Sequence, residues 1–300
     1  EYYTKNAKGE IIDPINPETG KSWGWSDVAD LNYDNKELRK EMTADMLHWI
    51  KNENIDGFRC DVASNVPLDF WQQAIPQLRK EKDIFMLAEA WEPELLKDGL
   101  FDMAYGWEVH HTMNRIAQGK NTVKDWDRLI EENAKKYESN DILMSFVDNH
   151  DENSWNGTVK GRLGKAEEAM TALSYVMPGM PLIYSGNEYG LNHSLKFFEK
   201  DSIPKIKGKE WELRAKLGKL KAENIALNGG KNKDKYTRIK TNDDTNILAF
   251  VREKNGKKVV YIANFSSKPI NSKVTITGEF VNYMTGKPMS LNDKVVITLQ

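Results

Sequence analysis

The sequence lacks the features of a disulfide-stabilised scaffold, a membrane protein or a nucleic-acid-binding protein. A single cysteine, Cys60, excludes an intrachain disulfide and any zinc site built from several cysteines. No apolar run approaches the roughly 18 residues of a membrane span. The 43 basic and 45 acidic residues give a net charge of −2, so no basic excess indicates nucleic acid. The chain has 300 residues, 39% of them hydrophobic, which suffices for one large domain, or one large and one small.

The N-terminal part shows no regular hydrophobic period. Residues 1–35 are rich in Gly, Pro, Asn and Asp and predict a long loop. The chain starts with "EYYTKNAKGE", without a methionine or a signal peptide. This opening resembles the middle of a longer protein.

Helical and strand patterns then alternate along the chain, which predicts βαβ units and a parallel sheet. The expected helices cover 36–52, 67–81, 108–137, 164–177 and 209–227, and the expected strands 55–63, 83–91, 100–107, 141–151 and 179–190. The strands are almost continuously apolar, as in a sheet that is covered on both faces.

The pattern changes after "NGGKNKD" at 228–234. Short strands follow at 246–253, 258–265, 273–280 and 294–299, and Asn255-Gly256 between the first two is a strong hairpin signal. This segment of about 70 residues predicts a separate antiparallel domain, a β-sandwich.

The stretch "GFRCDVA" at 57–63 places charges within an apolar strand. Side chains alternate along a strand, so Arg59 and Asp61 share one face. Cys60 lies on the opposite, apolar face, where we expect it to be an inert packed thiol.

Three expected strands end in an acid: Asp61, Glu89 and Asp151. In a (β/α) barrel the carboxyl ends of the strands converge on the active site. Arg59 shares a face with Asp61 and should keep it ionised, whereas Glu89 has apolar neighbours and no adjacent cation in the sequence, which favours a protonated acid. Such a pair suits glycoside hydrolysis.

Other interpretations of these residues remain open. An isolated Asp at a strand end is commonly a helix cap or a loop residue, and His150 can be a structural hydrogen-bonding group. A metal-dependent hydrolase could use His150 with Asp148 and Asp151. Among the nine tryptophans, Trp91 and Trp155 follow acidic strand ends and could stack on sugar faces. We expect three others to belong to core or helix packing, namely Trp49, Trp71 and Trp126.

Several motifs, in order, resemble those of the α-amylase family, glycoside hydrolase family 13. They are "VADLNYDN" at 28–35, "GFRCDVA" at 57–63, "MLAEAW" at 86–91, "FVDNHD" at 146–151 and "GMPLIYSGNEYG" at 179–190. The resemblance covers roughly residues 24–225, and the strand-rich C-terminal part also fits the family.

The resemblance implies a role for each matching residue. Asp61 would be the nucleophile, Glu89 the general acid and then base, and Asp151 the stabiliser of the transition state. Arg59 would hold Asp61 ionised, and His150 would bind the sugar. The mechanism would be retaining, with the nucleophile and acid carboxyl groups about 5–5.5 Å apart.

The resemblance also implies the fold. Residues 1–35 would be the tail of an inserted loop domain and its connection to the barrel. Residues 36–228 would form part of a (β/α)8 TIM barrel, about strands four to eight, and residues 229–300 the C-terminal β-sandwich. The earliest family motif, Asp-x-x-x-Asn-His, is missing, so we expect the N-terminal barrel strands to belong to a longer protein.

Calcium is a further implication, because Asp30 matches a calcium ligand of many family members. Ser64-Asn65 stand where many α-amylases have Lys-His, at positions that help to bind sugar and calcium in the family. This departure leaves both the specificity and the calcium site open.

The sequence therefore predicts a hydrolase of α-1,4-glucosidic bonds in starch or maltooligosaccharides. The alternatives are a neopullulanase, an α-glucosidase or a glucan transferase with the same chemistry, and a non-catalytic carbohydrate-binding or accessory protein. The expected partner is an α-glucan, with no nucleic acid and no membrane span. From the substrate class we expect a secreted, periplasmic or cell-surface protein of a bacterium.

Overall fold

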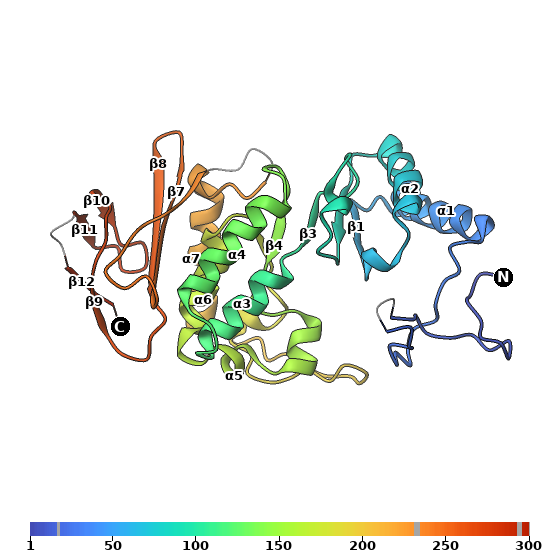
Figure 1. Ribbon diagram of the computed structural model, residues 1–300, viewed down its shortest axis with the longest axis horizontal. Coiled ribbons are helices and arrows are strands. Elements are labelled where there is room, and N and C mark those ends of the chain that lie inside the picture. The colour runs from blue at the N-terminus through green and yellow to red at the C-terminus, as the bar shows by residue number, and fades with distance from the viewer. Residues whose placement is uncertain (17–18, 231–234, 293–295, 300) are drawn as a thin grey trace. The chain divides into compact units, whose positions relative to one another are not determined.

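A computed structural model describes residues 1–16, 19–230 and 235–292, and the backbone of 296–299. The chain divides into two compact units, Glu1–Ala104 and Tyr105–Gln300 (Figure 1), which are described separately. Most of the change of pattern expected at 228–234, and the start of the strand expected at 294–299, lie outside the described residues. Within the described ranges, no helix is both long and apolar enough to cross a membrane.

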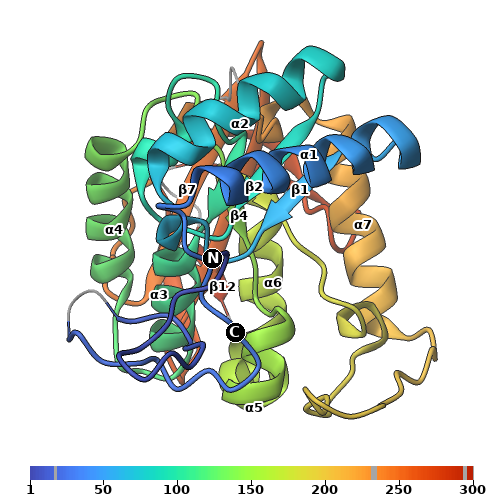
Figure 2. The ribbon, with the colours of Figure 1, turned by 90° about the vertical axis from the view of Figure 1, so that its right-hand side faces the viewer.

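In the first unit, two helices pack together as the sequence pattern predicts. Helix α1 (Lys36–Glu53) begins where the side chain of Asn35 accepts hydrogen bonds from the amides of Glu37 and Leu38. Helix α2 (Leu68–Glu81) lies beside it (Figure 2). The apolar stripe of α2 is buried, which accounts for the helical spacing read from the sequence.

Three parallel strands follow: β1 (Gly57–Cys60), β2 (Phe85–Ala88) and β3 (Met103–Tyr105), of which β3 runs over the end of this unit at Ala104. Arg59 pairs with Leu87, and Leu87 with Met103. Gly57 starts β1 with φ +148°, and an added Cβ would lie 1.8 Å from the carbonyl oxygen of Phe85. Only glycine allows this close approach of the two strands.

The second unit contains the remaining helices and two more parallel strands. They are α3 (Trp107–Ala117), α4 (Val123–Lys136), β4 (Leu143–Ser145), α5 (Val159–Leu163), α6 (Glu167–Val176), β5 (Met180–Pro181) and α7 (Lys209–Glu223). The expected strand at 141–151 is wrong beyond Ser145, because the chain turns there and Asp151 already has helical φ and ψ angles.

Antiparallel sheets follow in the same unit. One contains β6 (Lys235–Arg238), β7 (Ile247–Lys254) and β8 (Lys257–Asn264), and two-stranded sheets pair β9 (Ile270–Lys273) with β12 (Val296–Leu299) and β10 (Gly278–Val281) with β11 (Pro288–Leu291). The predicted hairpin is confirmed, with positive φ at both Asn255 and Gly256. The single strand expected at 273–280 is wrong, because this stretch contains the end of β9 and the start of β10.

Strand β7 is buried on both faces. Leu248 and Phe250 belong to the core that contains residues of α3, α4, α6 and α7. Ala249 and Val251, on the alternate face, pack with residues of the other C-terminal strands. A parallel α/β arrangement followed by antiparallel sheets is the fold class that the sequence predicts.

Candidate active site

Arg59 contacts two of the three predicted acids. Its Nη1 lies 2.5 Å from Oδ1 of Asp61, and its Nη2 lies 3.0 Å from Oε2 of Glu89. The contact with Asp61 confirms that the two side chains project to one side of β1. The planar guanidinium serves both carboxylates at once, which a single ammonium group does less well.

The backbone after β1 also binds Glu89. Val62 donates its amide to Oε2 of Glu89 at 2.8 Å. Glu89 donates its own amide to the carbonyl of Cys60, and its carbonyl accepts from Ala63, each at 3.0 Å. Val62 has φ +40°, a strained conformation for a β-branched residue. The strained residue is therefore the one whose amide donates to the Glu89 carboxylate.

The expectation that Glu89 has no cation beside it is wrong. It came from sequence neighbours, whereas the parallel register places Arg59 of β1 next to the end of β2. The two carboxylates differ instead in exposure, because the side chain of Asp61 is 72% exposed and that of Glu89 only 13%. Asp61 is thus open to an incoming molecule, while Glu89 is enclosed.

The third predicted acid lies in the second unit, in the turn after β4. His150 and Asp151 are partly exposed, with Nε2 of His150 3.4 Å from Oδ2 of Asp151. Asp151 is the N-cap of a short π-helical turn, η3 (Glu152–Asn156). π-helical turns occur frequently at functional sites.

A buried ionic network lies around this turn. Asp148 is fully buried, and it accepts hydrogen bonds from Nη2 of Arg162 at 2.7 Å and from Nδ2 of Asn187 at 3.1 Å. Burial raises the pKa of the Asp148 carboxyl, although Asn187 and Arg162 oppose this shift. Because an arginine neutralises Asp148, the arrangement does not favour a metal site that includes this carboxylate.

Glu152 extends the network to α3. Its Oε2 lies 2.9 Å from Nε2 of the buried His110. Desolvation acts to raise the pKa of Glu152, but His110 and Arg162 outweigh it, so the pKa lies below the ordinary value. The sequence gives no motif for His110 or Arg162, and their part in this network is seen only in the structure.

Three further residues were predicted to bind calcium or sugar: Asp30, Trp91 and Trp155. Asp30 uses its backbone amide and carbonyl in hydrogen bonds with Ile12 and Thr4. Among the described residues, no three His, Cys, Asp or Glu side chains gather where they could hold a metal ion. Trp91 and Trp155 are 49% and 61% exposed, as a role in sugar stacking requires.

Of the three tryptophans expected to pack in the core or between helices, two are buried and one is exposed. Trp71 and Trp126 are buried as expected, whereas Trp49 is 53% exposed on α1.

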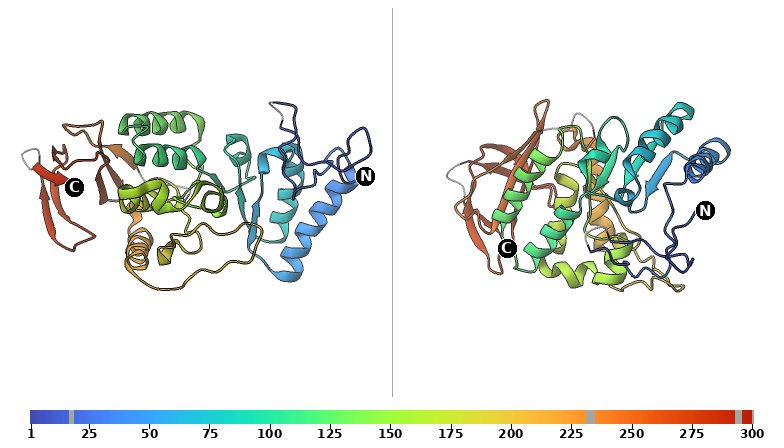
Figure 3. Two further views of the ribbon diagram at one scale, coloured as in Figure 1. Left: turned by 90° about the horizontal axis from the view of Figure 1, so that it is seen from below. Right: turned by 45° about the vertical axis from the view of Figure 1, so that its right-hand side comes forward.

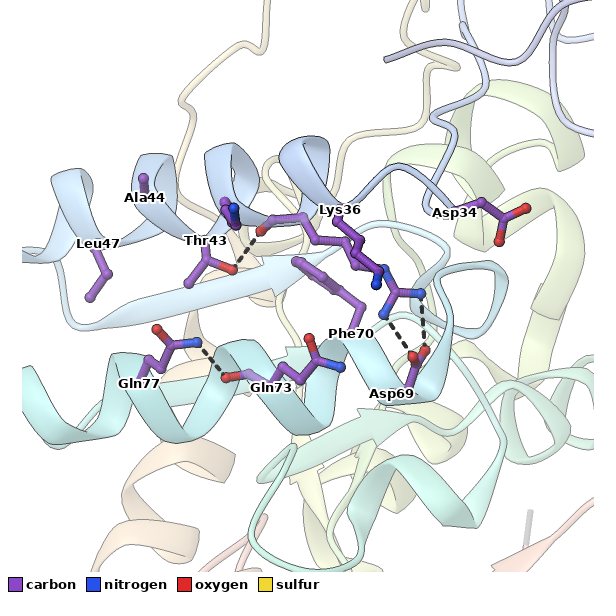
Figure 4. A pocket seen from close by; sticks show the side chains of 11 residues that line it. Asp34, Lys36, Thr43, Ala44, Leu47, Asp69, Phe70, Gln73 and Gln77 are labelled. Atoms are coloured by element: carbon purple, nitrogen blue, oxygen red, sulfur yellow. Dashed lines mark hydrogen bonds and ion pairs between the residues drawn. The ribbon is translucent and has the colours of Figure 1, made fainter. Parts of the chain in front are cut away.

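A separate groove of about 630 Å³ lies between α1 and α2, and Arg39 and Asp69 form an ion pair at its edge. None of the predicted site residues lines this groove (Figure 4).

Comparison with known proteins identifies relatives of the chain. The family model described as "Alpha amylase, catalytic domain" matches residues 22–246. The alpha-amylase MalA of Haloarcula japonica is 26% identical over 58% of this chain and 26% of its own length. An intracellular maltogenic amylase of Bacillus subtilis is 29% identical over 56% of this chain and 29% of its own. A 4-alpha-glucanotransferase of Thermotoga maritima is 28% identical over 54% of this chain and 37% of its own length. The chain thus matches well under half the length of these curated relatives.

Solved structures share the fold. The maltogenic alpha-amylase AmyB of Thermotoga neapolitana superposes with a TM-score of 0.84 at 22% identity, over 99% of this chain and 70% of that one. An alpha-amylase of Lactobacillus plantarum gives a TM-score of 0.81 at 23% identity, over the same shares. These similarities confirm the expected fold class, part of a (β/α)8 barrel followed by antiparallel C-terminal sheets.

Proposed function

Because the chain belongs to the alpha-amylase catalytic-domain family, we propose that the protein carrying it is a retaining glycoside hydrolase that cleaves α-1,4-glucosidic bonds in starch or maltooligosaccharides. The observation that carries the proposal is the contact of Arg59 with both Asp61 and Glu89. One exposed and one enclosed carboxylate beside the same cation suit the two-carboxylate chemistry of glycosidases.

In the first step, Asp61 attacks the anomeric carbon while the bond from that carbon to the leaving oxygen breaks. Glu89 gives its proton to that oxygen. In the second step, Glu89 takes a proton from water, which attacks the same carbon and releases Asp61. Once Asp61 is esterified it no longer carries a charge beside Arg59, and the contact of Arg59 with Glu89 favours the carboxylate that must act as base.

The other predicted residues act on the sugar itself. Asp151 would stabilise the positive charge that develops on the sugar ring and bind its hydroxyls, and His150 would donate a hydrogen bond to it. Their partial exposure supports these roles. The separation of about 5–5.5 Å between the carboxyl groups of Asp61 and Glu89 stays a prediction.

A second candidate function is transfer of the glycosyl group to another sugar instead of water. The similarity to a 4-alpha-glucanotransferase supports it. A neopullulanase or an α-glucosidase would share the same residues and differ in linkage or chain position. A non-catalytic carbohydrate-binding protein is the alternative of another class, and the presence of all three acids argues against it.

The test compares the full protein with its Asp61→Asn variant for release of reducing sugar from soluble starch. We expect activity in the parent and a loss of several orders of magnitude in the variant. NMR of the first product distinguishes retention from inversion of the anomeric configuration. Longer products from maltotriose would indicate transfer, and glucan binding without turnover would indicate the accessory role.

Two further expectations stay predictions. A calcium ion held in part by Asp30 would raise the melting temperature, and chelator would lower it again in the parent but not in an Asp30→Asn variant. Export from a bacterial cell would place activity outside the cytoplasm, which fractionation of the source cells measures.

A further inference from the structure

Three aromatic side chains gather on the surface of the second unit. Trp155, Phe197 and Phe198 are 61%, 41% and 66% exposed. The ring centroids of Trp155 and Phe197 are 5.1 Å apart, and those of Phe197 and Phe198 are 4.9 Å apart. Grouped exposed apolar rings indicate a binding surface, whereas a single exposed ring would not.

The two segments that carry these rings are tied together. Trp155 lies in η3, and the phenylalanines lie in the segment 191–208. This segment is irregular and leads to α7 (Figure 3). Between them, the buried Asn153 accepts the amide of Leu195 at 2.8 Å and donates to the carbonyl of His193 at 3.3 Å. Thr158 donates to Asn192 across the same gap at 2.7 Å. These hydrogen bonds hold together the two segments that carry the rings.

Hydrogen bonds to Asp201 also link residues within the segment that carries the phenylalanines. Oδ2 of Asp201 accepts the amide of Lys196 at 3.0 Å and lies 2.8 Å from Nε2 of His193. The amides of Lys196 and Ser202, together with His193, hold the pKa of Asp201 at about 2. Asp201 thus stays ionised throughout the mildly acidic and neutral range.

The position of the cluster along the chain points to its ligand. Asp151 directly precedes the turn η3, and Trp155 follows four residues later, within roughly one helical turn. A ligand held by His150 and Asp151 would therefore have its next portion near Trp155. Aromatic faces are electron-rich and attract the polarised C–H groups on the flat face of a sugar ring. Rigid aromatic rings also lose little conformational entropy on binding.

We propose that Trp155, Phe197 and Phe198 form a stacking platform for a glucosyl ring of an α-glucan chain that extends beyond the sugar at His150 and Asp151. The proposal rests on the proposed function and makes the protein selective for long oligosaccharides over short ones. Polar groups border the rings, among them the Lys196–Glu199 ion pair, and these suit a hydroxyl-rich ligand better than a lipid surface.

The test measures KM and kcat of the full protein for maltoheptaose and for a short aryl maltoside. Trp155→Leu and the double variant Phe197→Ala/Phe198→Ala should raise KM for maltoheptaose about tenfold, while the values for the short substrate stay within about twofold of the parent. Trp155→Phe should retain most of the affinity, because it keeps an aromatic face. Trp49→Leu is the matched control, since Trp49 is 53% exposed on α1, against 61% for Trp155.

Each other outcome counts against the platform. If the parent discriminates between long and short glucans and the Trp155 and phenylalanine variants discriminate equally well, the platform is wrong and the proposed function stands. If Trp49→Leu causes the same loss, the effect is not specific to these rings and the platform is wrong. If the parent neither binds nor cleaves glucan, both proposals fail together.

Discussion

Nη2 of Arg59 lies 3.0 Å from Oε2 of Glu89, across the interface of two parallel strands. The same guanidinium also contacts Asp61. One cation therefore orients both the nucleophile and the acid–base residue of the proposed mechanism. The arrangement depends on geometry as well as on charge, because the two carboxylates occupy different nitrogens of one planar group.

Arg59→Lys should therefore be a damaging substitution. A lysine keeps the charge but offers one point of contact, so it can orient Asp61 or Glu89 but not both. We expect kcat for maltoheptaose to fall by about 100-fold or more, a loss of transition-state stabilisation of about 3 kcal/mol. Steady-state kinetics of the full protein measure it.

Arg128→Lys provides the control for this substitution. Arg128 is an exposed residue of α4 paired with Asp125, and surface pairs of this kind contribute little. Its kinetics should match those of the parent. An Arg59→Lys variant with full activity would show that the bridge has no role in turnover.

The backbone at Val62 gives a second prediction. Val62 is strained at φ +40°, and its amide bonds Glu89, so Val62→Gly should keep the hydrogen bond and remove the strain. The gain from relieved strain exceeds the entropy that glycine adds to the unfolded chain, and we expect about 1 kcal/mol higher stability. Urea unfolding of the two proteins measures the difference.

Val66→Gly is the matched control, because Val66 has an ordinary φ of −87°. At this position glycine raises the entropy of the unfolded chain but relieves no backbone strain. The variant should therefore be less stable than the parent by about 0.5–1 kcal/mol. Equal destabilisation by both substitutions would mean that Val62 stores no strain.

The buried network in the second unit gives a third prediction. Arg162→Met removes the charge that neutralises the fully buried Asp148. An uncompensated buried charge costs about 3–5 kcal/mol. The variant should unfold at correspondingly lower urea concentration, with a reduced melting temperature.

The double variant Arg162→Met/Asp148→Asn separates charge from packing. It removes both charges, so it should be more stable than Arg162→Met alone, with a coupling energy of about 1–3 kcal/mol. Additive losses in the two single variants would mean that the pair is not coupled.

The sequence predicts contacts within one strand better than contacts between elements. Arg59 and Asp61 share a face because strands have a period of two, and this needs no tertiary information. The contact of Arg59 with Glu89 depends on the register of β1 against β2, which residues 57–60 and 85–88 do not encode locally. The Arg162–Asp148 pair joins residues 14 positions apart without any motif.

The positions of strand ends were predictable only in part. Phe146 and Val147 are buried and apolar, so the sequence extends the strand through them, yet β4 ends at Ser145. Burial of an irregular turn leaves the same apolar signature as a buried strand. The position of Asp151 in a helical turn, and with it the link to Trp155, therefore came from the structure.

Cys60 gives the last prediction, on the apolar side of β1. Burial raises the pKa of its thiol from 9.0 to about 12, although the charge of Arg59 acts to lower it. The folded chain therefore keeps the thiol proton to a higher pH than the unfolded chain does. The resulting stabilisation is complete below about pH 9 and is lost as the pH rises towards about 12, since the unfolded state deprotonates first.

The measurement compares the pH dependence of unfolding free energy between the parent and Cys60→Ala. Lysines and other tyrosines titrate in the same range in both proteins, so the difference between the two curves reports the thiol together with its electrostatic coupling to Tyr33. The parent should lose stability more steeply between pH 9 and pH 12, by about 1.4 kcal/mol per pH unit at most. Parallel curves, or rapid labelling of native Cys60 by a thiol reagent at pH 8, would show that the thiol is accessible and not held in the apolar layer.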